Sequence, residues 1–155
     1  MKLIFSLSLL FFYFILLFAQ DEEKQVNNKG NNVEEEIWSL EEDYISYFGD
    51  AKHNAILSLY HTQFLGWPDS ELHPASKERA KKYLEEKHPE QHKVVSQINR
   101  EGVRILGNIA ITHYLLKLSW IDDEGVEQTS ESRLTHTWIK EDSQWKIFGG
   151  MSNRK

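Results

Sequence analysis

The chain has 155 residues and no cysteine, and its 18 Lys and Arg against 24 Asp and Glu give a formal net charge of −6. The absence of cysteine excludes disulfide bonds, thiol nucleophiles and thiolate metal sites. A net-negative chain without a basic stripe is a poor nucleic-acid binder, so we expect no nucleic-acid partner.

The N-terminus has the layout of a secretory signal peptide. Lys2 is followed by an apolar run from Leu3 to Phe18, and an acidic stretch begins at Asp21. The run is long for the apolar core of a signal peptide but shorter than the roughly 20 residues that span a bilayer. We therefore predict a signal peptide over residues 1–20 and an exported protein, periplasmic or extracellular. An uncleaved N-terminal anchor is the alternative, and only this alternative would place the protein on a membrane.

Residues 21–32 are polar and rich in Asn, Lys and Glu, a composition that is typical of a flexible linker. Apolar periodicity begins at Val33, so one folded domain is expected over residues 33–155.

Three helices are predicted at the start of this domain. Gly49 ends the first, the second covers about 51–60 and the third about 77–87. Between the last two, a short extended piece begins at Phe64 and stops at Pro68. The apolar stripe of the first helix consists of Ile37, Leu40, Tyr44 and Phe48, widened by Trp38 and Ile45.

Beyond the helices the apolar period becomes two, which indicates strands. They are predicted over 94–106, 109–121, 127–140 and 145–151, the first with a bulge at Gly102. The strand over 109–121 is apolar on both faces, as expected of a central strand that is covered on both sides. Helices followed by a long antiparallel sheet indicate an α+β fold.

The last two strands carry the most informative pattern. Arg133-Leu134-Thr135-His136-Thr137-Trp138 leads through a four-residue polar turn, Glu141 to Gln144, into Trp145-Lys146-Ile147. This pattern resembles the last hairpin of the nuclear transport factor 2-like superfamily, in its polyketide-cyclase-like (SnoaL-like) branch. The resemblance covers about Val33 to Ser152 and also rests on Gly49-Asp50, Leu59-Tyr60 and Gly107.

The resemblance implies a cone-shaped α+β barrel, in which three N-terminal helices pack on a strongly curved, mainly antiparallel sheet and a pocket opens between them. It places His136 in the cone. The ketosteroid isomerase-like branch has an acidic hydrogen-bond donor at the matching position, and the association domains of calmodulin-dependent kinases have an Arg. Many members are homodimers. The outer face with Thr135, Thr137 and Ile139 is apolar and Thr-rich, which predicts a homodimer through the sheet.

The predicted pocket is formed by aromatic and histidine side chains, because apolar pockets with few polar groups are typical ligand sites. His113 and Tyr114 point in opposite directions along their strand, so only one of them can line the cone. A hydrogen-bonded core residue is the alternative for His113, and core packing is the alternative for the aromatic residues. The predicted pocket consists of Tyr44, Tyr60, Phe64, Trp67, His113, His136 and Trp138.

Two side chains are candidates for catalysis. His136 could donate a hydrogen bond to a ligand oxygen or titrate near neutral pH, and Asp43 on the first helix could act as a base. A solvated helix-face acid is the alternative for Asp43. The general base of the isomerase-like branch is missing, since Trp67 precedes Pro68 where that branch has a carboxylate. If His136 lines a roomy pocket, its replacement by Ala should change ligand binding more than stability.

His88 and His92 have the spacing of two zinc ligands on a helix, but Pro89 lies between them and no third ligand is evident. We therefore predict no metal and no cofactor.

The resulting prediction is an exported domain with a conical pocket that binds a small apolar ligand, without an assignable reaction. One alternative is a polyketide-cyclase or ketosteroid-isomerase-like enzyme, in which His136 and an acid on the first helix shift a proton. A dimerising interaction module is the other alternative, and the scaffold by itself does not choose among the three.

Overall fold

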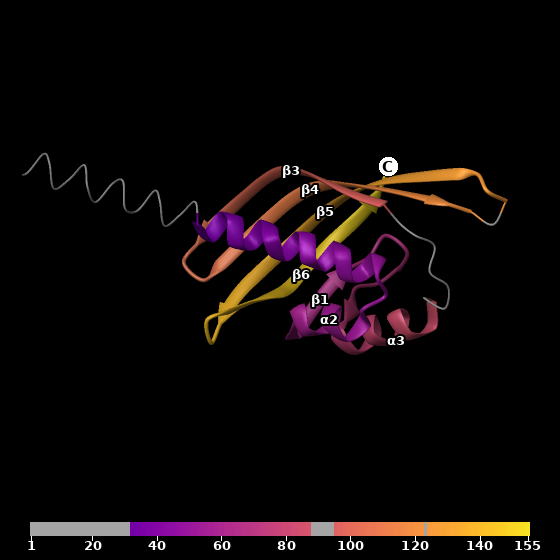
Figure 1. Ribbon diagram of the computed structural model, residues 1–155. Coiled ribbons are helices and arrows are strands. Elements are labelled where there is room, and N and C mark those ends of the chain that lie inside the picture. The colour runs from indigo at the N-terminus through magenta and orange to yellow at the C-terminus, as the bar shows by residue number, and fades with distance from the viewer. Residues whose placement is uncertain (1–31, 88–94, 123) are drawn as a thin grey trace, which may run out of the picture. The chain divides into compact units, whose positions relative to one another are not determined.

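The computed structural model describes residues 32–87, 95–122 and 124–155 (Figure 1). The predicted signal peptide (1–20) and all of the predicted linker except Asn32 lie outside the described residues, as do His88 and His92. The chain divides into two compact units, Met1–Glu36 and Ile37–Lys155, and the second contains the whole sheet. In the described part of the chain, no helix is both long enough and apolar enough to cross a membrane.

The elements follow the predicted order. A first helix over residues 32–49 is followed by α2 (His53–Leu59), β1 (Tyr60–Trp67), β2 (Ala75–Ser76) and α3 (Lys77–Lys87). The remaining strands are β3 (Val95–Leu106), β4 (Ile109–Ile121), β5 (Glu127–Glu141) and β6 (Gln144–Arg154).

The six strands form one mixed sheet in the order β2-β1-β6-β5-β4-β3. β1 runs parallel to β6, and every other pair of neighbours is antiparallel. The α+β class is confirmed, with three helices on this sheet (Figure 1). The predicted barrel is not closed by the described strands, because β2 and β3 lie at opposite edges and do not pair. The cone and the strong curvature stay predictions.

β1 is a longer strand than the extended piece predicted from Phe64. It begins at Tyr60, directly after α2, and pairs with both β6 and β2. The partner β6 lies at the far end of the chain, so this parallel pairing is a tertiary feature that local sequence does not encode.

Alternation along β4 and β5 decides which side chains face the helices. On β5, His136 and Trp138 are buried as predicted, and on β4 Thr112 and Tyr114 are buried beside them. The expectation that β4 is covered on both faces is wrong for the single chain, because its outer face is exposed to solvent. Ile109 and Ile111 point to the other face and are 43% and 38% exposed.

The first helix turns a narrower stripe toward the sheet than predicted. Ile37, Trp38, Glu41 and Ile45 are buried, whereas Leu40, Tyr44 and Phe48 are half-buried. The stripe therefore has a carboxylate at its centre.

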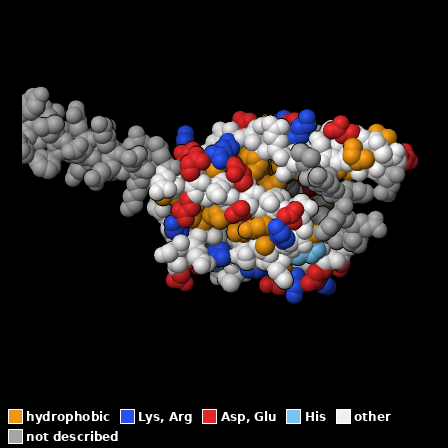
Figure 2. All heavy atoms as spheres, in the orientation of Figure 1, with side chains coloured by type: hydrophobic (Ala, Val, Ile, Leu, Met, Phe, Trp, Pro, Cys, Tyr) orange, Lys and Arg blue, Asp and Glu red, His pale blue; other side chains and the backbone are white. Residues whose placement is uncertain are grey.

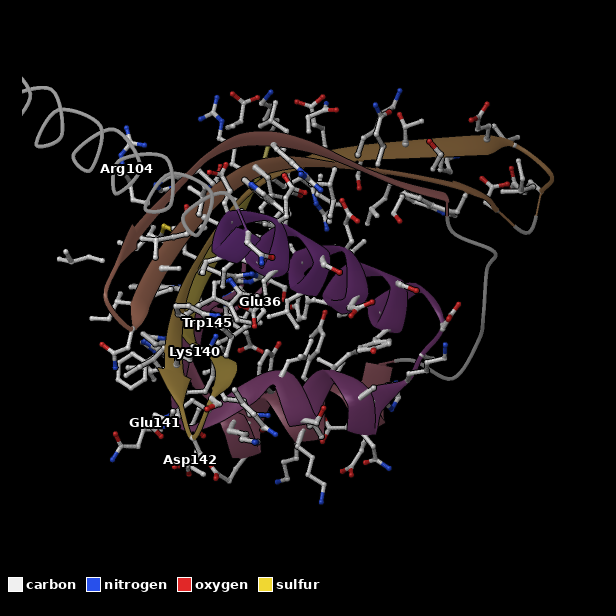
Figure 3. All side chains as sticks on the ribbon, turned by 60° about the vertical axis from the view of Figure 1, so that its left-hand side comes forward. Glu36, Arg104, Lys140, Glu141, Asp142 and Trp145 are labelled. Carbon is white, nitrogen blue, oxygen red and sulfur yellow. The ribbon has the colours of Figure 1, made fainter. Side chains whose placement is uncertain are left out.

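A bulge in β3 and the turn between β5 and β6 lie where the sequence predicts them. The register of β3 on β4 shifts between Arg100 and Gly102, which confirms the predicted bulge. The polar turn between β5 and β6 consists of Asp142 and Ser143 alone, with φ of 48° and 64° (Figure 3). Positive φ at both positions is what a two-residue hairpin loop needs if its twist is to match that of the strands.

Gly149 and Gly150 allow β6 to approach both of its neighbours closely. A Cβ on Gly149 would lie 2.5 Å from the Leu65 carbonyl oxygen of β1, and one on Gly150 would overlap the Thr135 carbonyl oxygen of β5. Both obstacles are backbone atoms in a paired ladder, so neither can move aside locally.

We predict that Gly150→Ala lowers the free energy of unfolding by about 1–3 kcal/mol, the usual cost of forcing extra volume into a packed site. Gly102→Ala on β3 is the matched control, because a Cβ there meets nothing within 4 Å. Urea denaturation of both variants checks the prediction. Equal stability of Gly150→Ala and Gly102→Ala would contradict the close approach.

Candidate functional site

A carboxylate lies at the centre of the helix–sheet interface. Ile37, Glu41 and Ile45 follow one another at one-turn spacing, so all three face the sheet, and Glu41 is 0% exposed. A charged group removed from water in this way is stable only if hydrogen-bond donors surround it.

Three side chains of β4 and β5 supply those donors. The Thr112 hydroxyl and the Trp138 Nε1–H donate to Glu41 Oε1 over 2.5 and 2.7 Å, and His136 Nδ1 lies 2.8 Å from Glu41 Oε2. Thr112 is the register partner of His136, and Trp138 follows two residues later on the same face. We call Glu41, Thr112, His136 and Trp138 the carboxylate cluster.

The cluster keeps Glu41 ionised. Burial is the largest single influence and raises the pKa of Glu41, but the His136 charge and the hydrogen bonds from the cluster together hold the pKa below its ordinary value. The Tyr114 hydroxyl is buried near the same carboxylate. Burial, and then the Glu41 charge, raise the pKa of Tyr114 well above its usual range, so this phenol stays neutral.

His136 is packed on several sides as well as hydrogen-bonded. Its ring centroid lies 5.0 Å from that of Tyr44, 6.0 Å from Tyr114 and 6.3 Å from Trp138, each in an edge-to-face arrangement. His136 is 7% exposed. Removing it would take a hydrogen-bond partner from a buried carboxylate, so the expectation of a small stability cost for His136→Ala does not fit this environment.

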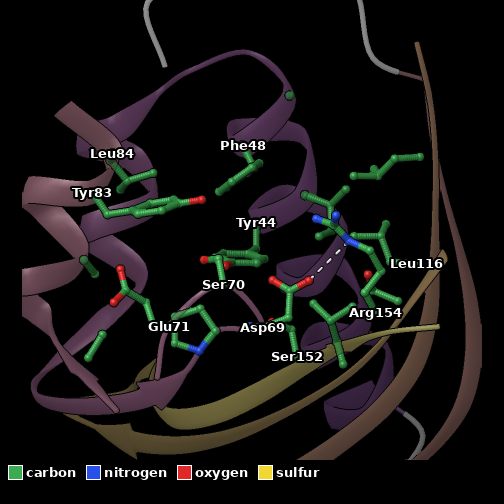
Figure 4. A pocket seen from close by; sticks show the side chains of 18 of the residues that line it. Tyr44, Phe48, Asp69, Ser70, Glu71, Tyr83, Leu84, Leu116, Ser152 and Arg154 are labelled. Carbon is green, nitrogen blue, oxygen red and sulfur yellow. Dashed lines mark hydrogen bonds and ion pairs between the residues drawn. The ribbon is translucent and has the colours of Figure 1, made fainter. Parts of the chain in front are cut away.

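A cavity of about 510 Å³ lies beside the carboxylate cluster, with Tyr44 in its wall (Figure 4). The first helix contributes Tyr44 and Phe48, α3 contributes Tyr83 and Leu84, and β4 contributes Leu116. Most of this lining is apolar, which is typical of small-molecule sites.

Two tyrosine side chains place a pair of hydroxyl groups in this mostly apolar lining. The Tyr44 and Tyr60 hydroxyls lie 3.2 Å apart and share a hydrogen bond, in which either can be the donor. Burial is the main reason why the pKa of each phenol is raised, so both are neutral near pH 7. Phe64 stacks on the Tyr60 ring, with centroids 4.1 Å apart and planes within 3°.

Two ion pairs lie at the wall formed by the loop after β1. Arg154 Nε at the end of β6 is 3.4 Å from Asp69 Oδ2, and Arg79 Nη2 of α3 is 3.0 Å from Glu71 Oε1. Figure 4 shows Asp69, Ser70 and Glu71 turned toward the cavity. The Asp69 backbone N–H donates to Ser152 Oγ over 3.0 Å, which ties this loop to β6.

The structure brings only part of the predicted pocket together. Tyr44, Tyr60 and Phe64 line the cavity, whereas His136 and Trp138 belong to the carboxylate cluster and are not in the cavity wall.

The other predicted residues point elsewhere. His113 is on the outer face of β4, where its Nδ1 lies 2.8 Å from Thr135 Oγ1. Trp67 is 45% exposed and donates its Nε1–H to the Glu71 carbonyl oxygen. Asp43 is exposed on the first helix and does not line the cavity. Alternation along the strands and the rotation of the first helix turn these three side chains away from the cavity.

Sequence reasoning missed Glu41, the two arginines of the ion pairs and Tyr83. Glu41 had a usable signal, since it falls midway between Ile37 and Ile45 on the buried stripe. No sequence signal marked Arg79 and Arg154, because their places in the cavity wall depend on how β2, α3 and the end of β6 pack together. Among the described residues no group of three or more His, Asp or Glu side chains could hold a metal ion.

Comparison with known families and structures gives a consistent result. A sequence model of the family described as calcium/calmodulin dependent protein kinase II association domain matches residues 33–150. A search of the curated proteins found no match.

Solved structures share the fold at low identity. The association domain of CaMKII from C. elegans is 16% identical, with a TM-score of 0.70 over 77% of this chain and 94% of that chain. An NTF2-like protein of unknown function from Pseudomonas putida KT2440 is 19% identical, with a TM-score of 0.70 over 79% of this chain and 87% of that chain. A ketosteroid isomerase-like protein from Erwinia carotovora atroseptica SCRI1043 is 12% identical, with a TM-score of 0.60 over 72% of this chain and 87% of that chain. Such likeness confirms the nuclear transport factor 2-like fold alone, and the SnoaL-like branch stays a prediction.

We predict that Glu41→Gln lowers the free energy of unfolding by about 3–5 kcal/mol near pH 7, because it breaks a buried pair and turns an amide N–H₂ toward a donor. The folded pKa of Glu41 lies below its ordinary value of 4.5, so its contribution is fully present above pH 4.5 and is lost as the pH falls through the folded value. The difference between wild type and Glu41→Gln should therefore shrink in acid.

Urea unfolding near pH 7 and near pH 3 measures both effects. Glu42→Gln is the matched control, since the Glu42 side chain is 55% exposed and pairs with Arg100 at the surface. Loss of such a pair costs about 0–1 kcal/mol. A Glu41→Gln protein as stable as Glu42→Gln would refute the role of the cluster.

Proposed function

Because the chain belongs to the calcium/calmodulin dependent protein kinase II association domain family, we propose that it is a self-associating domain whose copies meet through the outer face of the sheet. The observation that carries this proposal is an apolar patch on the face of the sheet that the helices leave uncovered.

The patch follows from strand register. Ile111 of β4, Thr137 of β5, Gly149 of β6 and Leu65 of β1 are successive register partners, so they form one row across four strands. His113, Thr135, Met151 and Trp67 form the next row in the same way. We call five exposed apolar side chains of this face the outer patch: Leu65, Trp67, Ile109, Ile111 and Met151, which are 58%, 45%, 43%, 38% and 55% exposed.

The outer patch has the properties of an interface between copies. Contiguous exposed apolar side chains on a sheet are better covered than wet. One patch that meets a second copy of itself gives a closed, two-fold dimer. Such a dimer leaves the opposite face of the sheet, which carries the cavity, free.

We predict that Ile111→Glu converts the associated protein to monomers, because it places two charges at the centre of the symmetric contact. Sedimentation equilibrium at micromolar concentration measures the change, and circular dichroism checks that the variant is folded. Leu72→Glu is the control, since Leu72 is 87% exposed in the loop after β1 and is outside the outer patch. A folded Ile111→Glu protein that associates like wild type, or a monomeric wild type, would exclude this face.

Binding of a small molecule is a second candidate function, favoured by the cavity itself. Its volume of about 510 Å³ falls within the roughly 300–1,000 Å³ of small-molecule sites. The enzyme alternative has less support. Asp43 is exposed on the first helix, and His136 is engaged by Glu41 in the core, so neither proposed catalytic group lines the cavity.

Export also remains part of the proposal, and it rests on the apolar run from Leu3 to Phe18. We expect protein purified from its own host to begin near Asp21 and to carry a bound small molecule. Native mass spectrometry followed by denaturing mass spectrometry of the same sample measures both. A full-length mass that includes Met1 would contradict signal cleavage, and identical native and denatured protomer masses would argue against a retained ligand.

A further inference from the structure

The charges of the described cavity lining cancel. Asp69, Glu71, Arg79 and Arg154 are the charged residues of its described lining, and each arginine pairs with one of the two carboxylates. Both arginine side chains are more than half exposed, at 51% and 69%, so they lie at the edge of the cavity rather than in its depth. The described lining therefore offers no unpaired cation to an anionic ligand.

The inner end of the cavity is also unfavourable for an anion. The ionised Glu41 lies behind Tyr44, and its charge adds to burial and to the Tyr60 contact in raising the pKa of Tyr44. His136 lies near this end but is already paired with Glu41. A ligand carboxylate placed here would lose its water and gain no free counter-charge, which costs free energy.

The same end offers a neutral hydrogen-bond donor. The Tyr44 and Tyr60 hydroxyls have two protons between them, and their mutual hydrogen bond uses one. Whichever phenol donates, the other keeps a proton that can be given to a ligand oxygen.

The sheet wall adds neutral hydroxyl groups. Ser96 and Ser130 flank Leu118 in register, and Ser132 is the partner of Leu116, so serine and leucine alternate on this wall. Among the described residues these three serine hydroxyls form no hydrogen bond with protein. Each can donate or accept, so they suit a ligand with oxygen atoms and do not select for charge.

We propose that the cavity takes an uncharged aromatic compound whose carbonyl or hydroxyl oxygen hydrogen-bonds to the Tyr44–Tyr60 pair. The stacked Tyr60 and Phe64 rings and the nearby Tyr83 and Trp120 provide the aromatic walls. This inference rests on the proposed ligand-binding function and names the chemical class that the site accepts.

Three probes of similar size test it by equilibrium dialysis with the full chain at pH 7.5. Benzophenone is uncharged and has a carbonyl oxygen, diphenylmethane lacks the oxygen, and diphenylacetate carries a carboxylate. One hydrogen bond corresponds to about 3–10-fold in affinity, so benzophenone should bind about 3–10-fold more tightly than diphenylmethane. Diphenylacetate should bind more weakly than both.

The double substitution Tyr44→Phe, Tyr60→Phe removes both phenols and should abolish the preference for benzophenone over diphenylmethane. Tyr47→Phe is the control, because Tyr47 does not line the cavity. Diphenylacetate binding as tightly as benzophenone would overturn the inference while leaving ligand binding intact. An unchanged preference in the double variant would overturn the role of the phenol pair. Failure of all three probes to bind would instead refute ligand binding in the cavity, and the inference with it.

Discussion

The placement of the first helix on the sheet depends on the burial of one carboxylate, Glu41. A desolvated charge needs partners, and Glu41 finds them on two adjacent strands whose register fixes Thr112 beside His136. Rotation of the helix by one residue toward Leu40 would leave these donors without a carboxylate. Rotation toward Glu42 would turn the buried Ile37 and Ile45 away from the sheet. The helix therefore has one favourable rotation, which places Tyr44 between the carboxylate cluster and the cavity.

One sheet serves two purposes because its side chains alternate. Along β5, His136 and Trp138 hydrogen-bond to Glu41 of the first helix, while Thr135 and Thr137 lie on the outer face beside the outer patch. Apolar residues on the outer positions are costly for an isolated chain, since they add nothing to its own core. Their presence is explained if the outer face is buried against a second copy, and the cavity on the opposite face then remains accessible to a ligand.

The polar and apolar character of the cavity depends on the side chains of this chain and not on its backbone architecture. Chains with the same architecture are described as an association domain and as a ketosteroid isomerase-like protein, so the scaffold does not decide the activity. The side chains do decide what the cavity accepts. Paired charges at its edge and neutral phenols at its inner end favour an uncharged ligand, because neither end repays the desolvation of a charge.

The sequence by itself determined the α+β class, the positions of the last four strands, the bulge at Gly102 and the inward face of β5, because these follow from short-range periodicity and turn chemistry. Only the tertiary structure decided which side chains meet. The sequence indicated His136 as a pocket residue, but Glu41 approaches it from a helix far away in the chain and turns it into part of the core. The parallel pairing of β1 with β6 likewise exposed Trp67 and brought Arg154 to the cavity. Local patterns fix the direction of a side chain relative to its own element, whereas its partners depend on how distant elements pack, and the chemistry of this site arises at that second level.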